Sequence, residues 1–124
     1  MKILHITIAI VLGWMTPVGI HVATAADIDM SGTWSISVEY LNNIEKAEIL
    51  LIQKGNALSG TYNSKFNKSA LIDGSLSGNV FEIRIDREEG SDLIYKGVID
   101  GATMKGSASV RGRSSTKDFT GEKQ

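Results

Sequence analysis

The sequence has no cysteine, a single proline and only two histidines in 124 residues. Both histidines, His5 and His21, lie in the first 26 residues, so the rest of the chain has neither histidine nor cysteine. This absence excludes Ser–His–Asp and Cys–His catalysis and the ordinary zinc and copper sites. It also excludes the disulfides on which many small secreted domains depend, so the fold relies on closure and packing. Carboxylate chemistry and an all-oxygen site for a hard cation remain open.

The first 26 residues have the pattern of a secretory signal peptide. Lys2 gives a positive start, residues 3–15 are mostly apolar, Pro17 follows, and small residues end the segment at Ala25 and Ala26. These are the parts of a cleavable signal, and the apolar stretch is short for a membrane span of about 20 residues. We expect cleavage after Ala25 or Ala26, a secreted protein that is periplasmic or extracellular, and no membrane anchor after cleavage.

Residues 27–124 are expected to form a single domain, since about 100 residues is an ordinary domain size. The chain has 13 Lys and Arg residues, and the leader removes Lys2, which leaves 12 basic against 14 acidic residues. Nucleic-acid binding needs a basic face, so we expect no nucleic-acid partner. No motif indicates a cofactor or a metal, and the sequence leaves the oligomeric state open.

Alternation of apolar and polar residues after residue 30 predicts β-strands. In residues 32–40, for example, Trp34, Ile36 and Val38 share one face and Ser35 and Ser37 the other. Eight such segments at short spacing predict an all-β sandwich or barrel with no helix. The segments are residues 32–40, 46–53, 57–64, 71–76, 80–86, 93–100, 103–110 and 117–122.

The connections between these segments fall into two classes. The even-numbered ones, in residues 53–57, 76–80 and 99–103, are tight and contain glycine, which supplies the positive φ of short hairpins. The odd-numbered ones, in residues 41–45, 63–70, 87–92 and 111–117, read as longer polar loops. In an up-and-down meander the two classes lie at opposite ends. We therefore expect a barrel with a closed end of tight turns and an open end rimmed by four loops.

A similar glycine-containing segment occurs twice, as KGNALSGT in residues 54–61 and DGATMKGS in residues 100–107. No helix follows either copy, so neither is a phosphate-binding loop of the usual kind. The repeat instead predicts two similar four-stranded halves that close into an eight-stranded barrel, which either packs solid or holds one small ligand. Four glycines alternate inward and are interpreted as structural, at positions of close strand approach: Gly60, Gly74, Gly97 and Gly106.

The aromatic residues supply the candidate site. Trp34 lies early in the first strand and is interpreted as a structural plug of the closed end. The predicted inward tyrosines either line a pocket or fill the core with their hydroxyls toward solvent. The candidate ligand-binding residues are these tyrosines and three rim residues, namely Tyr40, Tyr62, Tyr95, Phe66, Arg87 and Arg111.

One rim loop is acidic and another is basic. Residues 86–92 include Asp86, Glu88, Glu89 and Asp92, whose carboxylates are potential Ca²⁺ ligands. The EF-hand spacing is absent, and a solvated acidic loop is the alternative interpretation. The basic residues of 111–117 either pair with this loop or attract a charged ligand group.

The chain resembles small secreted bacterial β-barrels of the calycin superfamily, which includes lipocalins and avidins. Four segments carry this resemblance, namely GTW (32–34), LSGTY (58–62), GSLSGN (74–79) and GVIDGATMKG (97–106). The resemblance implies a calycin-like, lipocalin-like barrel with a binding role. Avidin-type biotin sites need several tryptophans, whereas only Trp34 follows the leader. Lipocalins usually pair the first-strand tryptophan with a late arginine, and this chain offers Lys123 at that end.

Three functions remain possible from the sequence. We expect foremost a non-enzymatic binding module for a small, partly apolar or amphipathic ligand at the open end. The alternative is a protein–protein interaction or inhibitor module that uses the charged rim. A carboxylate-based enzyme is the least favoured, because the acidic residues identified within the strands face outward by parity.

Overall fold

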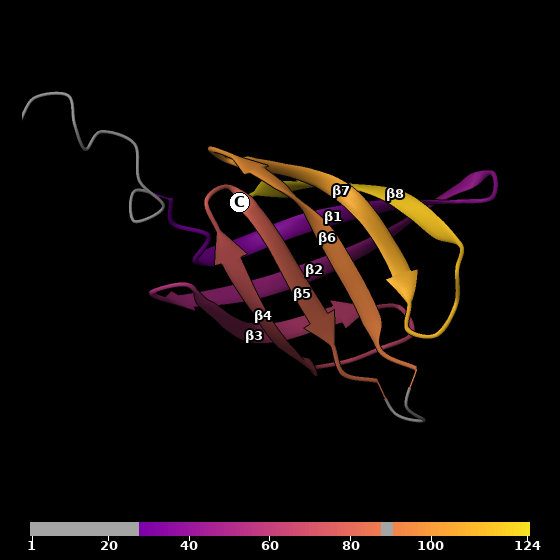
Figure 1. Cartoon of the computed structure of the whole chain (residues 1–124). Coiled ribbons are helices and arrows are strands. Elements are labelled where there is room, and N and C mark those ends of the chain that lie inside the picture. Colours follow the sequence, from indigo (N-terminus) through magenta and orange to yellow (C-terminus); the bar gives the residue numbers. More distant parts are fainter. Residues whose placement is uncertain (1–27, 88–90) are drawn as a thin grey trace, which may run out of the picture.

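The computed structural model describes residues 28–87 and 91–124, and the predicted signal peptide lies outside this part of the chain. The described residues form eight antiparallel strands in chain order, and β1 pairs with both β2 and β8 to close a barrel (Figure 1). The strands are β1 (Gly32–Tyr40), β2 (Asn43–Lys54), β3 (Ala57–Ser64), β4 (Ala70–Ser77), β5 (Val80–Ile85), β6 (Leu93–Asp100), β7 (Thr103–Val110) and β8 (Thr116–Lys123). The predicted all-β, eight-stranded up-and-down barrel is confirmed. Within these ranges no helix is long and apolar enough to cross a membrane.

The inward side chains fill the barrel with a continuous apolar core. Phe81 and Phe119 meet edge to face with ring centroids 6.3 Å apart, and Tyr95 packs on Phe119 at 4.8 Å. Burial of this apolar surface drives folding in a chain without disulfides. The buried hydrophobic residues are Met30, Trp34, Ile36, Ile49, Leu51, Leu58, Tyr62, Ile72, Leu76, Phe81, Ile83, Ile85, Tyr95, Ile99, Met104, Ala108 and Phe119.

Glycines allow neighbouring strands to approach closely at four positions of the barrel. Gly97 of β6 and Gly106 of β7 are paired, and a Cβ on either would collide with a backbone carbonyl oxygen of the other strand. A Cβ on Gly74 would collide in the same way with β5. Gly60 also has a φ of +145°, a conformation that other residues rarely adopt. These four positions therefore require glycine for reasons of geometry.

The closed end consists of three two-residue turns and a short plug from the N-terminal side. The turns are residues 55–56, 78–79 and 101–102, each beginning with glycine. Residues 28–31 precede β1, and Met30 is completely buried. Trp34 Nε1 donates a hydrogen bond to the Met30 carbonyl oxygen at 2.9 Å, and Lys123 Nζ lies 5.9 Å from the Trp34 ring centroid. Both Met30 and Trp34 thus close this end.

The open end contains the four odd connections, which Figure 1 places on the right. Three of them are loops, of residues 65–69, 86–92 and 111–115. The prediction of a longer polar loop after β1 is wrong, because Tyr40 pairs directly with Asn43 and only Leu41 and Asn42 form the turn. The β1–β2 hairpin itself extends past the neighbouring strands (Figure 1). We call this turn and the three loops the open-end rim.

Candidate functional site

Two of the three candidate tyrosines form the floor of the open end. Tyr62 of β3 and Tyr95 of β6 are both buried, and their ring centroids lie 6.4 Å apart. Tyr95 also packs against Phe119, so the rings fill the space between them. A ligand that entered the barrel would have to displace these side chains, because close-packed interiors leave no spare volume.

The chemistry of Tyr95 reflects this enclosure. Burial raises the pKa of its hydroxyl above the ordinary value of 10.0, the neighbouring Tyr62 raises it further, and Arg87 opposes the shift. Loss of hydration penalises the phenolate because the low-polarity core cannot replace water. Tyr95 is therefore a neutral core residue.

Tyr40 is not part of this floor. It lies near the tip of the projecting β1–β2 hairpin and is 45% exposed. The Lys117 ammonium nitrogen lies 4.4 Å from the centre of its ring, a distance at which the cation is attracted to the ring face. The three tyrosines that share inward parity are therefore divided between the core and the rim.

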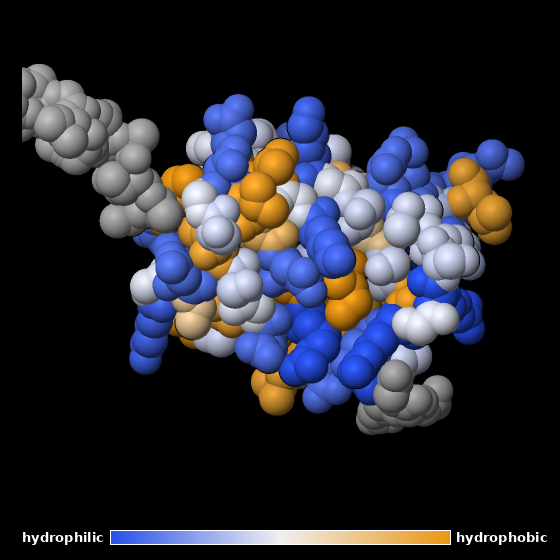
Figure 2. Space-filling view, viewed as in Figure 1, coloured by the Kyte–Doolittle hydropathy of each residue, from blue (hydrophilic) through white to orange (hydrophobic). Residues whose placement is uncertain are grey.

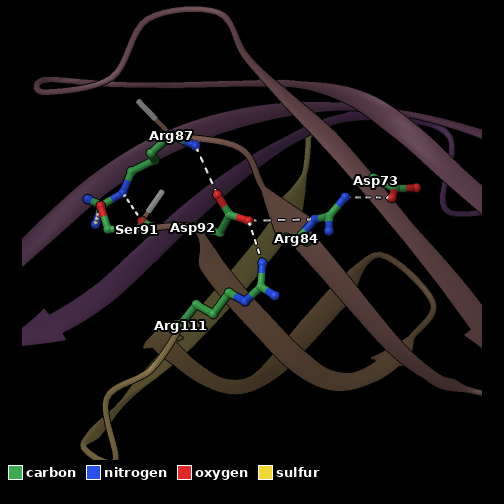
Figure 3. Close-up of polar contacts among 6 residues, drawn as sticks. All are labelled: Asp73, Arg84, Arg87, Ser91, Asp92 and Arg111. Atoms are coloured by element: carbon green, nitrogen blue, oxygen red, sulfur yellow. Dashed lines mark hydrogen bonds and ion pairs between the residues drawn. The ribbon is translucent and has the colours of Figure 1, made fainter. Parts of the chain in front are cut away.

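A buried carboxylate ties three rim elements together (Figure 3). Asp92, only 7% exposed, precedes β6. Its Oδ2 lies 3.8 Å from Arg84 Nε and 3.6 Å from Arg111 Nη1, while Oδ1 accepts a hydrogen bond of 3.4 Å from the Arg87 backbone N–H. Arg84 Nη2 also reaches Asp73 Oδ2 at 3.0 Å. Asp92 thus links β5, the β5–β6 loop and the β7–β8 loop.

The candidate residues Arg87 and Arg111 are both engaged within this network. Arg87 donates from Nε to the Ser91 carbonyl oxygen at 2.6 Å and from Nη2 to the Ser91 hydroxyl at 3.1 Å. The Arg111 backbone N–H donates to the Asp92 carbonyl oxygen at 2.8 Å. Their first role is to hold the loops, which leaves the remaining guanidinium edges for a partner.

The calcium interpretation of residues 86–92 has little geometric support. Asp92 faces arginines rather than other carboxylates. Among the described residues no group of three or more His, Cys, Asp or Glu side chains is arranged to hold a metal. Glu88 and Glu89, which belonged to the same prediction, lie outside the described residues.

The structure brings two of the predicted rim residues, Phe66 and Arg87, to one hollow between the β3–β4 and β5–β6 loops. The hollow has a volume of about 430 Å³ and opens to solvent. Phe66 is 73% exposed, and Lys65 Nζ lies 5.7 Å from its ring centroid. The other lining residues are Asn67, Lys68, Ala70, Asp86 and Ser91.

A larger depression of about 640 Å³ lies on the outer wall over β6, β7 and β8. It follows the bend at the paired Gly97 and Gly106, and charged side chains including Lys96, Lys105 and Asp118 border it. Sequence reasoning did not identify it, because a hollow outside a barrel depends on sheet curvature and not on the alternation of residues.

Two further rim features escaped prediction. Glu45 has the same parity as Ala47 and Ile49 and pairs with Val38, so it lies on the inward side of the hairpin. The extension of β2 by three residues beyond the predicted start at residue 46 accounts for this. Leu41 is 85% exposed at the turn, and leucine at this position does not indicate an unusual backbone.

Comparison of the sequence with models of known protein families and with curated proteins finds no match in either case. The function is therefore argued from the residues of this chain.

Proposed function

We propose that this protein is a non-enzymatic binding module that uses the open-end rim and that its partner covers the rim from outside. The observation that carries this proposal is the filled barrel beneath the rim. Tyr62, Tyr95 and Phe119 occupy the space in which an enclosed ligand would lie. The large exposed aromatic residues of the described chain, Tyr40 and Phe66, are both at the open end.

The network around Asp92 supports a preformed arrangement at one side of the rim. Asp92 joins Arg87 of the β5–β6 loop to Arg111 of the β7–β8 loop, so these residues are held before a partner arrives. Rigid loops bind with a smaller entropic cost than loops that order on binding. The engagement of this buried carboxylate by arginines also supports a binding role over acid–base catalysis.

The second candidate is a small amphipathic ligand with an anionic group. It is favoured by the hollow at the rim, which combines the exposed Phe66 ring with the cationic Lys68 and Arg87. An aromatic or aliphatic acid would place its apolar part against Phe66 and its carboxylate toward the basic side chains. A thermal-shift screen of such acids tests this candidate. A ligand of this kind raises the melting temperature of the wild type and has less effect on Phe66→Ser.

The rim proposal is tested with a fluorophore attached to a single introduced cysteine. Because the sequence has no cysteine of its own, the fluorophore reacts only at the introduced position. Ser114→Cys places an environment-sensitive fluorophore on the β7–β8 loop of the rim. Ser77→Cys is the matched control, a similar exposed serine where β4 reaches the closed end. Each labelled protein is titrated with soluble and membrane fractions of the cells that produce it.

The proposal expects a saturable change of emission from the label at position 114 and none from the label at position 77. A response at position 77 alone, or an equal response at both positions, contradicts it. A ligand that enters the barrel is recognised separately, because it would alter the packing of Tyr62 and Tyr95 and therefore their near-ultraviolet circular dichroism.

A further inference from the structure

The turn between β1 and β2 has the backbone of a glycine turn but contains leucine in the first position. Leu41 has a φ of 57°, whereas the three closed-end turns have Gly55, Gly78 and Gly101 at this position, with φ of 62°, 63° and 61°. In all four turns the second residue lies outside the positive-φ region, as in a type II′ turn. This conformation strongly favours glycine, because a Cβ approaches the following carbonyl oxygen.

No compensating contact for Leu41 is found in the described chain. Its side chain is 85% exposed. In the closed-end turns the carbonyl oxygens of Asn56, Asn79 and Ala102 accept hydrogen bonds from neighbouring strands. No described residue donates a comparable bond to Asn42. The unfavourable backbone of this exposed leucine, at the tip of a projecting hairpin, therefore lowers the stability of the fold. Strain of this kind is often associated with function.

The two loops beside this hairpin are basic. Since β1 pairs with β8 and β2 pairs with β3, the hairpin lies between the β7–β8 loop and the β3–β4 loop. Residues 65–69 and 111–117 include five basic residues and no acidic residue, although the whole chain has a net charge of −1. These basic residues are Lys65, Lys68, Arg111, Arg113 and Lys117.

The described acidic residues of the rim belong to another loop, although Asp86 lines the same hollow as Phe66 and Lys68, and Asp92 pairs with Arg111 at 3.6 Å. Asp86 and Asp92 belong to the β5–β6 loop, which the strand order puts across the mouth from the hairpin. On the hairpin itself, Glu39 pairs with Ile44 and Glu45 pairs with Val38, and Lys46 donates a hydrogen bond to the Ser37 hydroxyl at 2.8 Å. Leu41 and Phe66 are therefore flanked by the basic residues of 65–69 and 111–117, whereas Glu39 and Glu45 lie farther from the turn.

Apolar and cationic groups are also paired at short range on this surface. Lys117 lies over the Tyr40 ring at 4.4 Å, and Lys65 lies 5.7 Å from the Phe66 ring centroid. Figure 2 shows hydrophobic atoms at the projecting end of the β1–β2 hairpin with hydrophilic atoms around them. At a bilayer surface such pairs place the ring at headgroup depth and the cation against phosphate.

From these observations we propose that the β1–β2 turn, with residues 65–69 and 111–117 on either side of it, docks on an anionic lipid surface. Leu41 and Phe66 enter the boundary between headgroups and acyl chains, and the five basic residues of segments 65–69 and 111–117 contact lipid phosphates. This proposal rests on the proposed function and names its partner. A lipid surface is favoured over a protein, because a bilayer accepts a protruding leucine without a complementary pocket.

The test uses sedimentation with sucrose-loaded vesicles of phosphatidylglycerol mixed with phosphatidylcholine, and vesicles of phosphatidylcholine alone. We expect binding to the anionic vesicles that weakens in 0.5 M NaCl, since salt screens exposed charges. Arg113→Glu changes the local charge by two, so it should weaken binding by more than about fivefold, which is the effect of one basic residue near an anionic surface. Lys54→Glu at the end of β2 is the matched control and should leave binding nearly unchanged.

Leu41→Gly separates docking from folding. It should weaken vesicle binding about tenfold through the lost apolar side chain, although it removes the unfavourable backbone and stabilises the fold. The matched control is Val80→Ser, which removes an exposed apolar side chain at the closed end. A loss of binding with a gain of stability cannot result from misfolding.

Several results would overturn the lipid proposal. Equal binding to phosphatidylcholine vesicles, unchanged binding of both Leu41→Gly and Arg113→Glu, or displacement by soluble glycerol phosphate would each do so. Absence of vesicle binding, with a response of the label at position 114 to the soluble fraction, shows a protein or small-molecule partner and leaves the proposed function intact. If neither vesicles nor cell fractions affect that label, both proposals are wrong.

Discussion

Leu41 and Gly55 occupy the same position in two hairpin turns of the same length, with φ of 57° and 62°. Leu41 lies at the open end and Gly55 at the closed end of the barrel. A Cβ added to Gly55 would meet no atom within 4 Å. The two positions therefore differ in residue type but share the same backbone requirement, which makes the energetic cost of the leucine directly measurable.

Replacing Leu41 by glycine and replacing Gly55 by leucine, in two separate variants, should change the free energy of unfolding in opposite directions. Leu41→Gly should raise the free energy of unfolding by about 1 kcal/mol, and Gly55→Leu should lower it by about 1 kcal/mol, because a left-handed backbone is unfavourable for leucine. Urea denaturation of the two variants and the wild type measures both changes. A destabilised Leu41→Gly protein would show that the leucine side chain stabilises the fold, and the argument for a docking role would fail.

Asp92→Asn should lower the free energy of unfolding by about 2 kcal/mol. The substitution leaves Arg84 and Arg111 near a neutral amide in place of the buried carboxylate, and removal of one partner of such a cluster is costly. Asp73→Asn is the control, because its ion pair with Arg84 is exposed and should contribute less than about 1 kcal/mol. Guanidinium denaturation compares the two. Equal losses would contradict the central place of Asp92 in the rim.

Tyr95 should make the fold sensitive to alkaline pH. Its pKa is raised in the folded protein, so above pH 10 the unfolded chain loses the phenolic proton before the folded chain does. The contribution of Tyr95 to the free energy of unfolding is complete at pH values below the pKa of Tyr95 in the unfolded chain. It falls as the pH rises above that pKa, by up to about 1.4 kcal/mol per pH unit. Denaturation between pH 9 and 11 should show a shallower fall for Tyr95→Phe than for the wild type. Parallel curves for both proteins would show that Tyr95 ionises without constraint.

Gly106→Ala should destabilise the barrel by about 3 kcal/mol or more, because the added Cβ would overlap a carbonyl oxygen of β6 and separate the paired strands. Gly78→Ala provides the comparison. Its Cβ would have no neighbour within 4 Å, so only the left-handed backbone opposes it, at about 1 kcal/mol. Thermal unfolding ranks the two variants, and a smaller loss for Gly106→Ala would contradict the close approach of β6 and β7.

The strands and their inward faces were predictable because alternation depends on local sequence alone. Trp34, Phe81 and Phe119 illustrate this, since each lies at an inward position of a strand with a clear period of two. The glycine turns were equally accessible. The buried position of Met30 was not predictable, because Met30 reaches the core from a segment without strand periodicity. Its place at the closed end depends on hydrogen bonds with Gln53 and Trp34 that no local pattern encodes.

The candidate site was less predictable because it depends on which loops meet and on backbone conformation. Phe66 and Arg87 were selected as rim residues and line the same hollow. Tyr40 shares the inward parity of Tyr62 but lies where the hairpin has left the barrel. The sequence predicts a polar loop around Leu41, because leucine carries no local signal for a positive φ.

The most direct test of the rim as the binding surface is amide hydrogen exchange with and without phosphatidylglycerol vesicles. We expect slower exchange in residues 41–42, 65–69 and 111–115, with no change in the closed-end turns at residues 55–56, 78–79 and 101–102. Core amides near Tyr62 and Tyr95 should also keep their rates. Protection of the closed-end turns, or altered exchange in the core without protection of the rim, would contradict the claim that the partner binds this filled barrel from outside.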